Sequence, residues 1–105
     1  MLGQKLKELR ESKGLVQRQV AAELQVDTAY ISKIESNEKP LSRHHLSKLA
    51  ELFGVTENDL LKFWLADKLY DIVKGEPLAK QSLEIVTREI THLERLEKGR
   101  ETRKQ

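Results

Sequence analysis

The sequence predicts an all-α protein, and three observations support this fold class. Glycine (5) and proline (2), which interrupt helices, are scarce among the 105 residues. Apolar residues recur at spacings of three and four, the period of an amphipathic helix. No segment alternates apolar and polar residues as a half-buried strand would. We therefore expect short helices joined by brief turns.

Composition excludes several classes of function. The chain has no cysteine, which rules out a disulfide framework, a thiolate nucleophile and a zinc ribbon. Its formal net charge of +2 is too small to indicate nucleic-acid binding by itself, so any such role depends on where the charges lie. No apolar run approaches the roughly 20 residues that span a bilayer, and no signal-peptide pattern is present. The sequence thus predicts a soluble cytoplasmic protein that does not enter membranes.

The first half of the chain divides into four helices. Leu2, Leu6 and Leu9 form one face of the first, which ends at the sequence SKG (12–14). The second helix ends near Leu24 and turns three apolar residues inward: Val20, Ala21 and Leu24. A third begins with Asp27 as its N-cap and is held by Ile31 and Ile34. After the loop 36–42, Ser42 caps a fourth helix that Gly54 closes.

Two longer helices follow. The sequence TENDL (56–60) resembles a capping box with Asp59 at its last position, and the helix after it should reach about Lys74. GEP (75–77) breaks this helix, and Pro77 suits the first turn of the next. The last helix spaces Leu83, Val86, Ile90 and Leu93 as an a/d heptad seam. The segment 98–105 has no apolar residue and is predicted to be a flexible charged tail.

The spacing of the second and third helices predicts a DNA-binding motif. Only a three- to four-residue turn separates Leu24 from the helix after Asp27, which is the helix-turn-helix arrangement. The second helix of this motif, which is the third helix of this chain, lies in the major groove of DNA. It needs an apolar seam on one side and small or polar residues on the other. Ile31 and Ile34 supply the seam, while the outward positions hold Thr28, Ala29, Ser32 and Lys33.

Residues 9–61 resemble the XRE/Cro, or lambda-repressor-like, helix-turn-helix family. The resemblance rests on Arg10, Gln17, Ala21, Val26, Ile31, Ile34, Glu35, the LAELFGV of the fourth helix and the DLL of the fifth. It implies a five-helix domain that binds a near-palindromic operator in double-stranded DNA as a homodimer and regulates transcription. It also implies an internal ion pair between Arg10 and Glu35.

The resemblance assigns roles to individual residues. The base-reading positions are Thr28, Ala29 and Lys33, with Tyr30 and Ser32 close enough to join them. Lys33 could donate to guanine, and the Ala29 methyl could meet a thymine methyl. The residues expected to contact the DNA backbone are Gln17, Arg18, Asn37, Lys39 and Arg43. Tyr30 could equally lie over the edge of the core, so its contact with DNA stays an open alternative.

Three positions depart from the family pattern. Val16 replaces the Ser or Thr that usually caps the second helix, so one backbone donor needs another partner. Gln25 stands in the turn where glycine is usual, at a cost on the order of 1 kcal/mol for a left-handed backbone. Asn37 replaces another glycine at lower cost. We expect a somewhat altered turn but an intact motif.

The segment after Leu61 is interpreted as a dimerisation extension. We expect a DNA-binding domain at 1–61, a helical extension at 62–97 and the tail at 98–105. The extension is rich in apolar residues that a subunit interface would need: Trp64, Leu65, Leu69, Ile72, Leu83, Val86, Ile90 and Leu93. Two alternatives remain, since the seam could pack onto the preceding helix of its own chain or bind a second protein.

An enzyme is the rival class that the sequence disfavours. It has no Gly-rich phosphate loop and no metal-ligand spacing, and the adjacent His44 and His45 point in different directions on a helix. We expect no cofactor and no metal. The stronger competitor is an antitoxin or another protein-interaction module built on the same fold. Acidic or bulky residues on the outer face of the third helix would favour that competitor, and this face has none.

Overall fold

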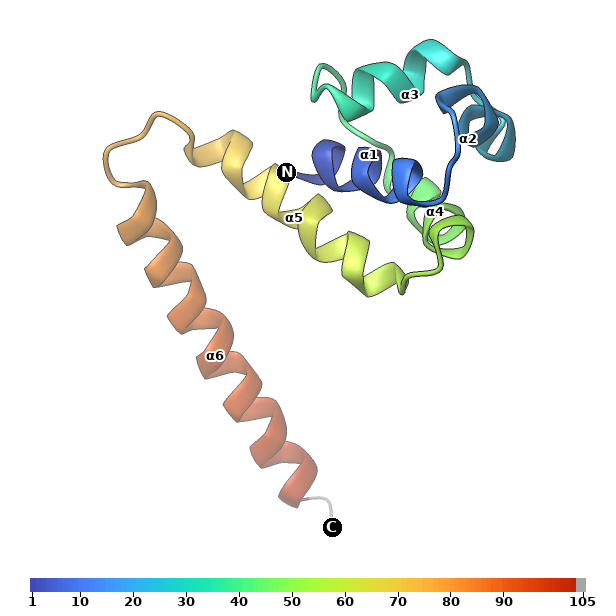
Figure 1. Ribbon diagram of the computed structural model, residues 1–105. Helices are drawn as coiled ribbons and strands as arrows, with labels where there is room; N and C mark the ends of the chain where they lie inside the picture. The colour runs from blue at the N-terminus through green and yellow to red at the C-terminus, as the bar shows by residue number, and fades with distance from the viewer. Residues whose placement is uncertain (104–105) are drawn as a thin grey trace. The chain divides into compact units, whose positions relative to one another are not determined.

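The structure is a computed structural model that describes residues 1–103, with side chains described to residue 100. Within this range every regular element is a helix, which confirms the predicted all-α fold. The elements are α1 (Leu2–Ser12), α2 (Gln17–Leu24), α3 (Thr28–Glu35), the 3-10 turn η1 (Arg43–His45), α4 (Leu46–Phe53), α5 (Glu57–Val73) and α6 (Ala79–Arg103). The chain divides into two compact units, Met1–Asp71 and residues 72–105. Figure 1 shows the elements in chain order.

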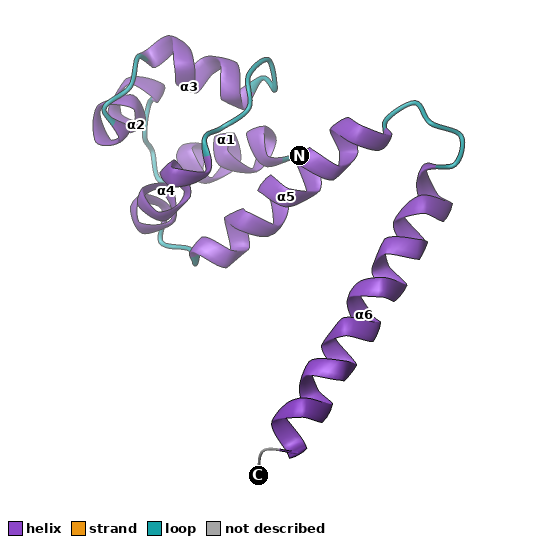
Figure 2. Ribbon diagram, turned by 180° about the vertical axis from the view of Figure 1, so that it is seen from behind, coloured by secondary structure: helices purple, strands orange, loops and turns teal. Residues whose placement is uncertain are grey.

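The first unit is built around one apolar core. Figure 2 shows the backbone of α1 to α5 grouped together and joined by loops. Phe53, Leu46 and Leu60 are almost completely buried at its centre, the last contributed by the first turns of α5. Ile31 and Ile34 are buried as predicted, so the apolar seam of α3 does attach that helix to the core. Partly buried residues at the margin include Val26, Tyr30, Phe63 and Trp64.

The start of α1 packs tightly against the end of α3. Gly3 is buried there, and a Cβ atom added to it would lie 2.5 Å from the carbonyl oxygen of Ile34 and 2.8 Å from that of Glu35. No side chain fits at such distances from backbone atoms. Glycine at position 3 therefore sets how closely the two helices approach.

Helix boundaries agree with the sequence in some places and differ in others. The capping box of α5 is confirmed: the Asp59 N–H donates to Thr56 Oγ1 at 3.1 Å, and the Thr56 N–H donates to Asp59 Oδ2 at 3.3 Å. The fourth helix does not start directly after Ser42, because η1 intervenes and Ser42 makes no side-chain capping bond. The last helix starts at Ala79, two positions after Pro77.

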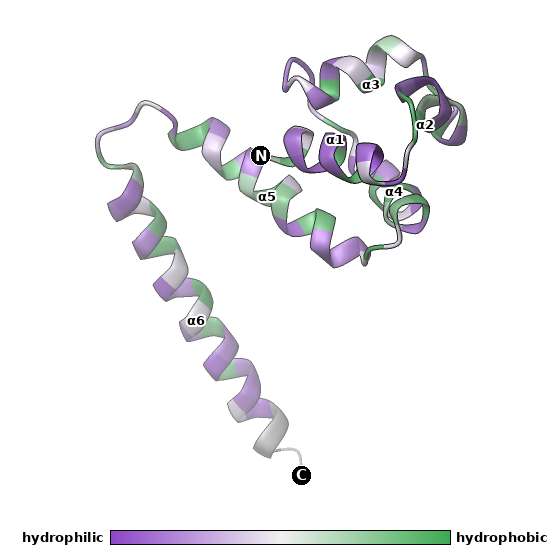
Figure 3. Cartoon of the chain, in the orientation of Figure 1, coloured by the Kyte–Doolittle hydropathy of each residue, from purple (hydrophilic) through white to green (hydrophobic). Residues whose placement is uncertain are grey.

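The second unit contains α6. It continues to Arg103, through most of the segment predicted to be a flexible tail; residues 104–105 of that segment lie outside the described residues. Figure 3 shows hydrophobic residues recurring along this helix among hydrophilic ones. The first unit extends to Asp71, so it includes the start of the segment 62–97 that the sequence assigns to the extension. Within the described residues, no helix is long and apolar enough to span a bilayer.

Candidate nucleic-acid interface

A tight left-handed turn joins α2 to α3. Gln25 adopts φ 58° and ψ 47°, the left-handed conformation expected there despite the missing glycine. The Val26 N–H donates to the Ala21 carbonyl and the Gln25 N–H to that of Ala22, at 3.0 and 3.2 Å. This is the Schellman pattern, which satisfies the last carbonyls of a helix. Asp27 then occupies the N-cap position in extended conformation, although its side chain makes no capping bond. The turn thus keeps the left-handed geometry of the motif, and the altered turn expected from Gln25 is not observed.

One face of α3 is free of contacts with the core. Thr28, Ala29, Ser32 and Lys33 are all exposed, while Ile31 and Ile34 face inward. Their spacings of one, four and five residues place the four exposed side chains together on one side of the helix. The face offers a hydroxyl pair, a methyl group and an ammonium group, which can donate to base edges or phosphates and contact a thymine methyl.

A buried ion pair holds the C-terminal end of α3. Arg10 Nε donates to Glu35 Oε2 at 2.7 Å and Arg10 Nη2 to Glu35 Oε1 at 3.1 Å, a two-pronged contact between α1 and α3. Arg10 Nη1 also donates to the Leu15 carbonyl at 2.8 Å. The hydrogen bond to Glu35 raises the pKa of Arg10, and burial acts in the opposite direction. Glu35 is only 9% exposed, so Arg10 is the cation that compensates this buried carboxylate.

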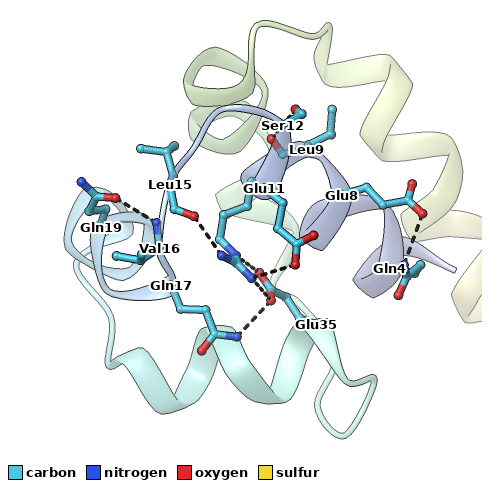
Figure 4. Close-up of polar contacts among 11 residues, drawn as sticks. Gln4, Glu8, Leu9, Glu11, Ser12, Leu15, Val16, Gln17, Gln19 and Glu35 are labelled. Atoms are coloured by element: carbon cyan, nitrogen blue, oxygen red, sulfur yellow. Dashed lines mark hydrogen bonds and ion pairs between the residues drawn. The ribbon is translucent and has the colours of Figure 1, made fainter.

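Gln17 extends the ion pair into α2. Its Nε2 donates to Glu35 Oε1 at 3.0 Å, and Figure 4 shows the amide reaching across to the carboxylate. The sequence assigns Gln17 to the DNA backbone, and in the structure its amide nitrogen is already bound to Glu35. The Val16 N–H, left without a Ser or Thr cap, donates to Gln19 Oε1 at 2.8 Å. The three helices α1, α2 and α3 thus share one polar network.

Tyr30 turns away from the exposed face of α3 and contacts the following loop. Its hydroxyl oxygen accepts a hydrogen bond from the Ser42 N–H at 3.2 Å. Its ring meets that of His45 edge-on at 5.8 Å between centroids, and the Lys39 Nζ lies 5.3 Å from the centroid of the same ring. These contacts favour the alternative in which Tyr30 covers the edge of the core. Asn37, in the same loop, has a positive φ of 64°.

Trp64 holds the other side of the loop. Its indole N–H donates to the Leu41 carbonyl at 2.7 Å, and Leu41 itself is buried. The Arg43 guanidinium stands 5.6 Å from the Trp64 ring centroid, over its face. The contact has no local sequence signal, because Trp64 and Leu41 lie 23 positions apart, and helical periodicity alone missed it. The loop with Asn37, Lys39 and Arg43 is therefore fixed by Tyr30 and Trp64.

Burial differs among the residues assigned to a dimer interface. Trp64 packs against the core of its own chain. Leu65, Leu69 and Ile72 are exposed on α5, Ile72 at 76%. On α6, Leu83 is partly exposed and Val86, Ile90 and Leu93 are exposed. Apart from Trp64, these apolar side chains have no complete cover within the described chain.

Comparison with known proteins identifies the first unit. A helix-turn-helix family model matches residues 6–60. The transcriptional regulator DdrOP3 of Deinococcus deserti is 34% identical over 61 residues, which are 58% of this chain and 47% of that protein. This chain thus spans about half the length of that relative. The control protein C.BamHI of Bacillus amyloliquefaciens is 34% identical over 64 residues, 60% of this chain and 79% of the control protein.

Solved structures agree with this fold. The crystal structure of SinR, the master regulator for biofilm formation, in complex with DNA is 32% identical with a TM-score of 0.53; the match covers 58% of this chain and 98% of the chain in that structure. A complex of the SinR and SinI proteins matches over 90% of this chain and 99% of its own at 24% identity and a TM-score of 0.53, which shows the fold alone. With the family model covering residues 6–60 and the α2–turn–α3 geometry in place, the chain belongs to the helix-turn-helix family of the XRE/Cro type.

Proposed function

We propose that this protein is a transcriptional regulator that binds a near-palindromic DNA operator as a homodimer, with α3 in the major groove. The observation that supports it most is the exposed face of α3. It combines Thr28, Ala29, Ser32 and Lys33 with no acidic or bulky side chain, on a helix whose other side is anchored by buried isoleucines. Relatives described as a transcriptional regulator and a control protein, and a SinR structure in complex with DNA, support the same function.

In this proposal the residues on and around α3 have different roles in DNA binding. Lys33 reads a base, with guanine the favoured partner because its O6 and N7 both accept. Lys39 and Arg43 contact phosphates, which fixes the register without reading sequence. Tyr30 and Trp64 act as positioning residues, because they hold the loop between them. The Gln17 amide, bonded to Glu35, is oriented with its oxygen left to accept another donor.

Dimerisation supplies most of the useful affinity in this scheme. One α3 reads only a few base pairs, and two joined subunits engage both half-sites at a high effective concentration. The half-sites are then expected about one helical turn, roughly 34 Å, apart. Exposed apolar residues on α5 and α6 support an interface between subunits.

The experiment is a selection of bound sequences from a random duplex library, followed by affinity measurements on the selected site. Lys33→Ala should weaken binding by about 1–3 kcal/mol and relax base preference at one position in each half-site. Lys7→Ala is the matched control, since Lys7 is exposed on α1. Arg43→Ala should weaken all sequences alike and make the salt dependence shallower.

Two results would contradict the proposal. If no sequence were enriched from the library, sequence-specific DNA binding would be excluded under those conditions, and the protein-interaction alternative would take its place. If a palindrome were enriched but Lys33→Ala behaved like Lys7→Ala in affinity and base preference, α3 would not be the reading helix.

A further inference from the structure

The apolar face of α6 needs an occupant, and its flanking charges indicate which one. Leu83 and Ile90 stand at the a positions of a heptad repeat, and Val86 and Leu93 at the d positions. In the described structure Val86, Ile90 and Leu93 are 47–53% exposed. We propose that this face binds the α6 of a second copy in antiparallel orientation, with Leu83 against Leu93 and Val86 against Ile90 of that copy. The inference rests on the homodimer proposed above and adds the orientation of its helices.

Charges beside the seam distinguish the two possible orientations. Between Lys80 and Lys98 the e positions hold Lys80, Thr87 and Glu94, and the only charged g position is Glu89. In a parallel pair, g of one helix meets e of the next heptad on the other, so Glu89 would face Glu94 twice. Like charges at such positions repel. The e and g positions therefore contribute no attraction to a parallel pair.

The antiparallel pair turns the same residues into attractive contacts. With Val86 set against Ile90, the e positions of the two helices meet, and Lys80 of each helix lies beside Glu94 of the other. Both side chains are exposed and make no ion pair among the described residues of their own chain. Two heptads separate them along α6, about 21 Å, so they cannot pair within one helix. Among the charged e and g positions of the antiparallel pair, one contact is unfavourable: the two Glu89 side chains meet near the two-fold axis.

Glu97 gives an independent indication of the same orientation. It occupies the next a position after Ile90, where a parallel pair would bring two carboxylates together in the seam. In the antiparallel pair Glu97 lies opposite Ala79, the first residue of the partner helix. The first turn of α6 has no acidic residue of its own. A carboxylate near the N-terminus of a helix is favourable, because it complements the positive end of the helix dipole.

The test uses charge reversal in the full chain, with dimer dissociation measured by sedimentation equilibrium at low salt. Lys80→Glu and Glu94→Lys should each weaken the dimer, on the order of tenfold, because two attractions become two repulsions. Mixing the two variants should restore a tight heterodimer, in which positions 80 and 94 again carry opposite charges across both contacts. Arg95→Glu is the control, since f positions such as Arg95 face away from the seam, and it should change nothing.

Orientation has a second, independent readout. The chain has no cysteine, so Gln81→Cys accepts a single spin label at an outer position of α6. The two labels should be offset by about 21 Å along the helices in the antiparallel pair and by nothing in a parallel one. Circular dichroism confirms that each variant keeps its helices.

The outcomes separate this inference from the homodimer itself. If Glu94→Lys tightened the dimer, the helices would be parallel; the inference would fail and the homodimer would stand. If neither reversal changed a dimeric protein, the interface would lie outside α6, with the same consequence. If the unmodified chain were monomeric at all concentrations tested, both proposals would fall, and the α6 face would pack on its own chain or bind another protein.

Discussion

At the scale of single residues, the buried carboxylate of Glu35 depends most on its partners for the stability of the fold. It is 9% exposed, and its partners are Arg10 from α1 and Gln17 from α2. Arg10→Ala would leave a buried carboxylate without a compensating charge, and the expected loss is about 3–5 kcal/mol of unfolding free energy. Urea unfolding followed by the fluorescence of Trp64, the only tryptophan, measures this for the first unit.

The double variant Arg10→Met with Glu35→Leu shows whether the loss comes from the isolated charge. Replacing both partners by apolar residues of similar size should recover most of the stability. If the double variant were as unstable as Arg10→Ala, the lost hydrogen bond to the Leu15 carbonyl would be the larger cause instead. The sequence resemblance predicted the Arg10–Glu35 pair, which is present in the structure, but not the added hydrogen bond from Gln17.

His45 introduces a pH dependence of a definite sign. Burial, and secondarily the neighbouring His44, lowers the pKa of His45 below its ordinary value. Between the lowered pKa of the folded state and about pH 6.5, the folded state holds fewer protons than the unfolded state, so stability falls as the pH drops from about 6.5 through that lowered pKa. His45→Gln should flatten the dependence between pH 7 and 5 in Trp64-detected urea titrations. His44→Gln serves as the control and should keep most of the slope; equal slopes in the His45 variant and the unmodified chain would contradict the assignment.

At the scale of elements, four successive helices end in one motif. After α1, α2, α3 and α4 the backbone turns left-handed, at Gly14, Gln25, Asn37 and Gly54. In each case the following N–H reaches back to a carbonyl five residues earlier, as Leu15 does to Arg10 and Val55 to Ala50. Glycine and asparagine adopt this conformation easily, and glutamine does not. Of these four helix C-termini, the one between α2 and α3 is thus the one with a strained backbone.

Gln25→Gly should relieve this strain. The expected gain is up to about 1 kcal/mol, reduced in part because glycine also loosens the unfolded chain. Gln25→Ala is the matched variant, because it shortens the exposed side chain and keeps the Cβ atom responsible for the strain. Urea midpoints should rise for Gln25→Gly alone. A rise of the same size for Gln25→Ala would mean that the side chain, rather than the backbone, is unfavourable.

How far the sequence predicts these elements depends on whether the signal is local. The stops at Gly14 and Gly54 and the capping box of α5 are encoded within a few residues, and all were predictable. The start of α4 was not predicted, since η1 precedes it and the Ser42 N–H donates to the hydroxyl of Tyr30, twelve positions away. Trp64 was assigned to a subunit interface on periodicity, whereas its N–H binds Leu41 across the fold. Contacts between a side chain and a distant backbone group leave no periodic pattern to detect.

At the scale of the whole molecule, we expect the two compact units to have different functions, DNA binding in the first and dimerisation in the second. The first unit, Met1–Asp71, contains every residue assigned to DNA. Its stability relies on contacts beyond Leu61, since Trp64 binds Leu41 and Asp67 Oδ2 accepts from the Leu2 N–H at 3.0 Å. Ending the chain after Leu61 would remove both contacts. Ending it after Lys74 keeps them and removes α6.

The chain shortened after Lys74 should therefore fold and lose only what α6 provides. We expect an unchanged Trp64 emission spectrum, because the surroundings of that ring in the first unit remain. Without α6, affinity for the selected palindrome should fall by about 100-fold or more, as two linked subunits become independent binders. Light scattering gives the oligomeric state, and binding to a single half-site serves as the control, since it should be nearly the same for both lengths. A shortened chain that stayed dimeric and bound the palindrome at full affinity would place the interface on α5 alone, where Leu65, Leu69 and Ile72 are exposed.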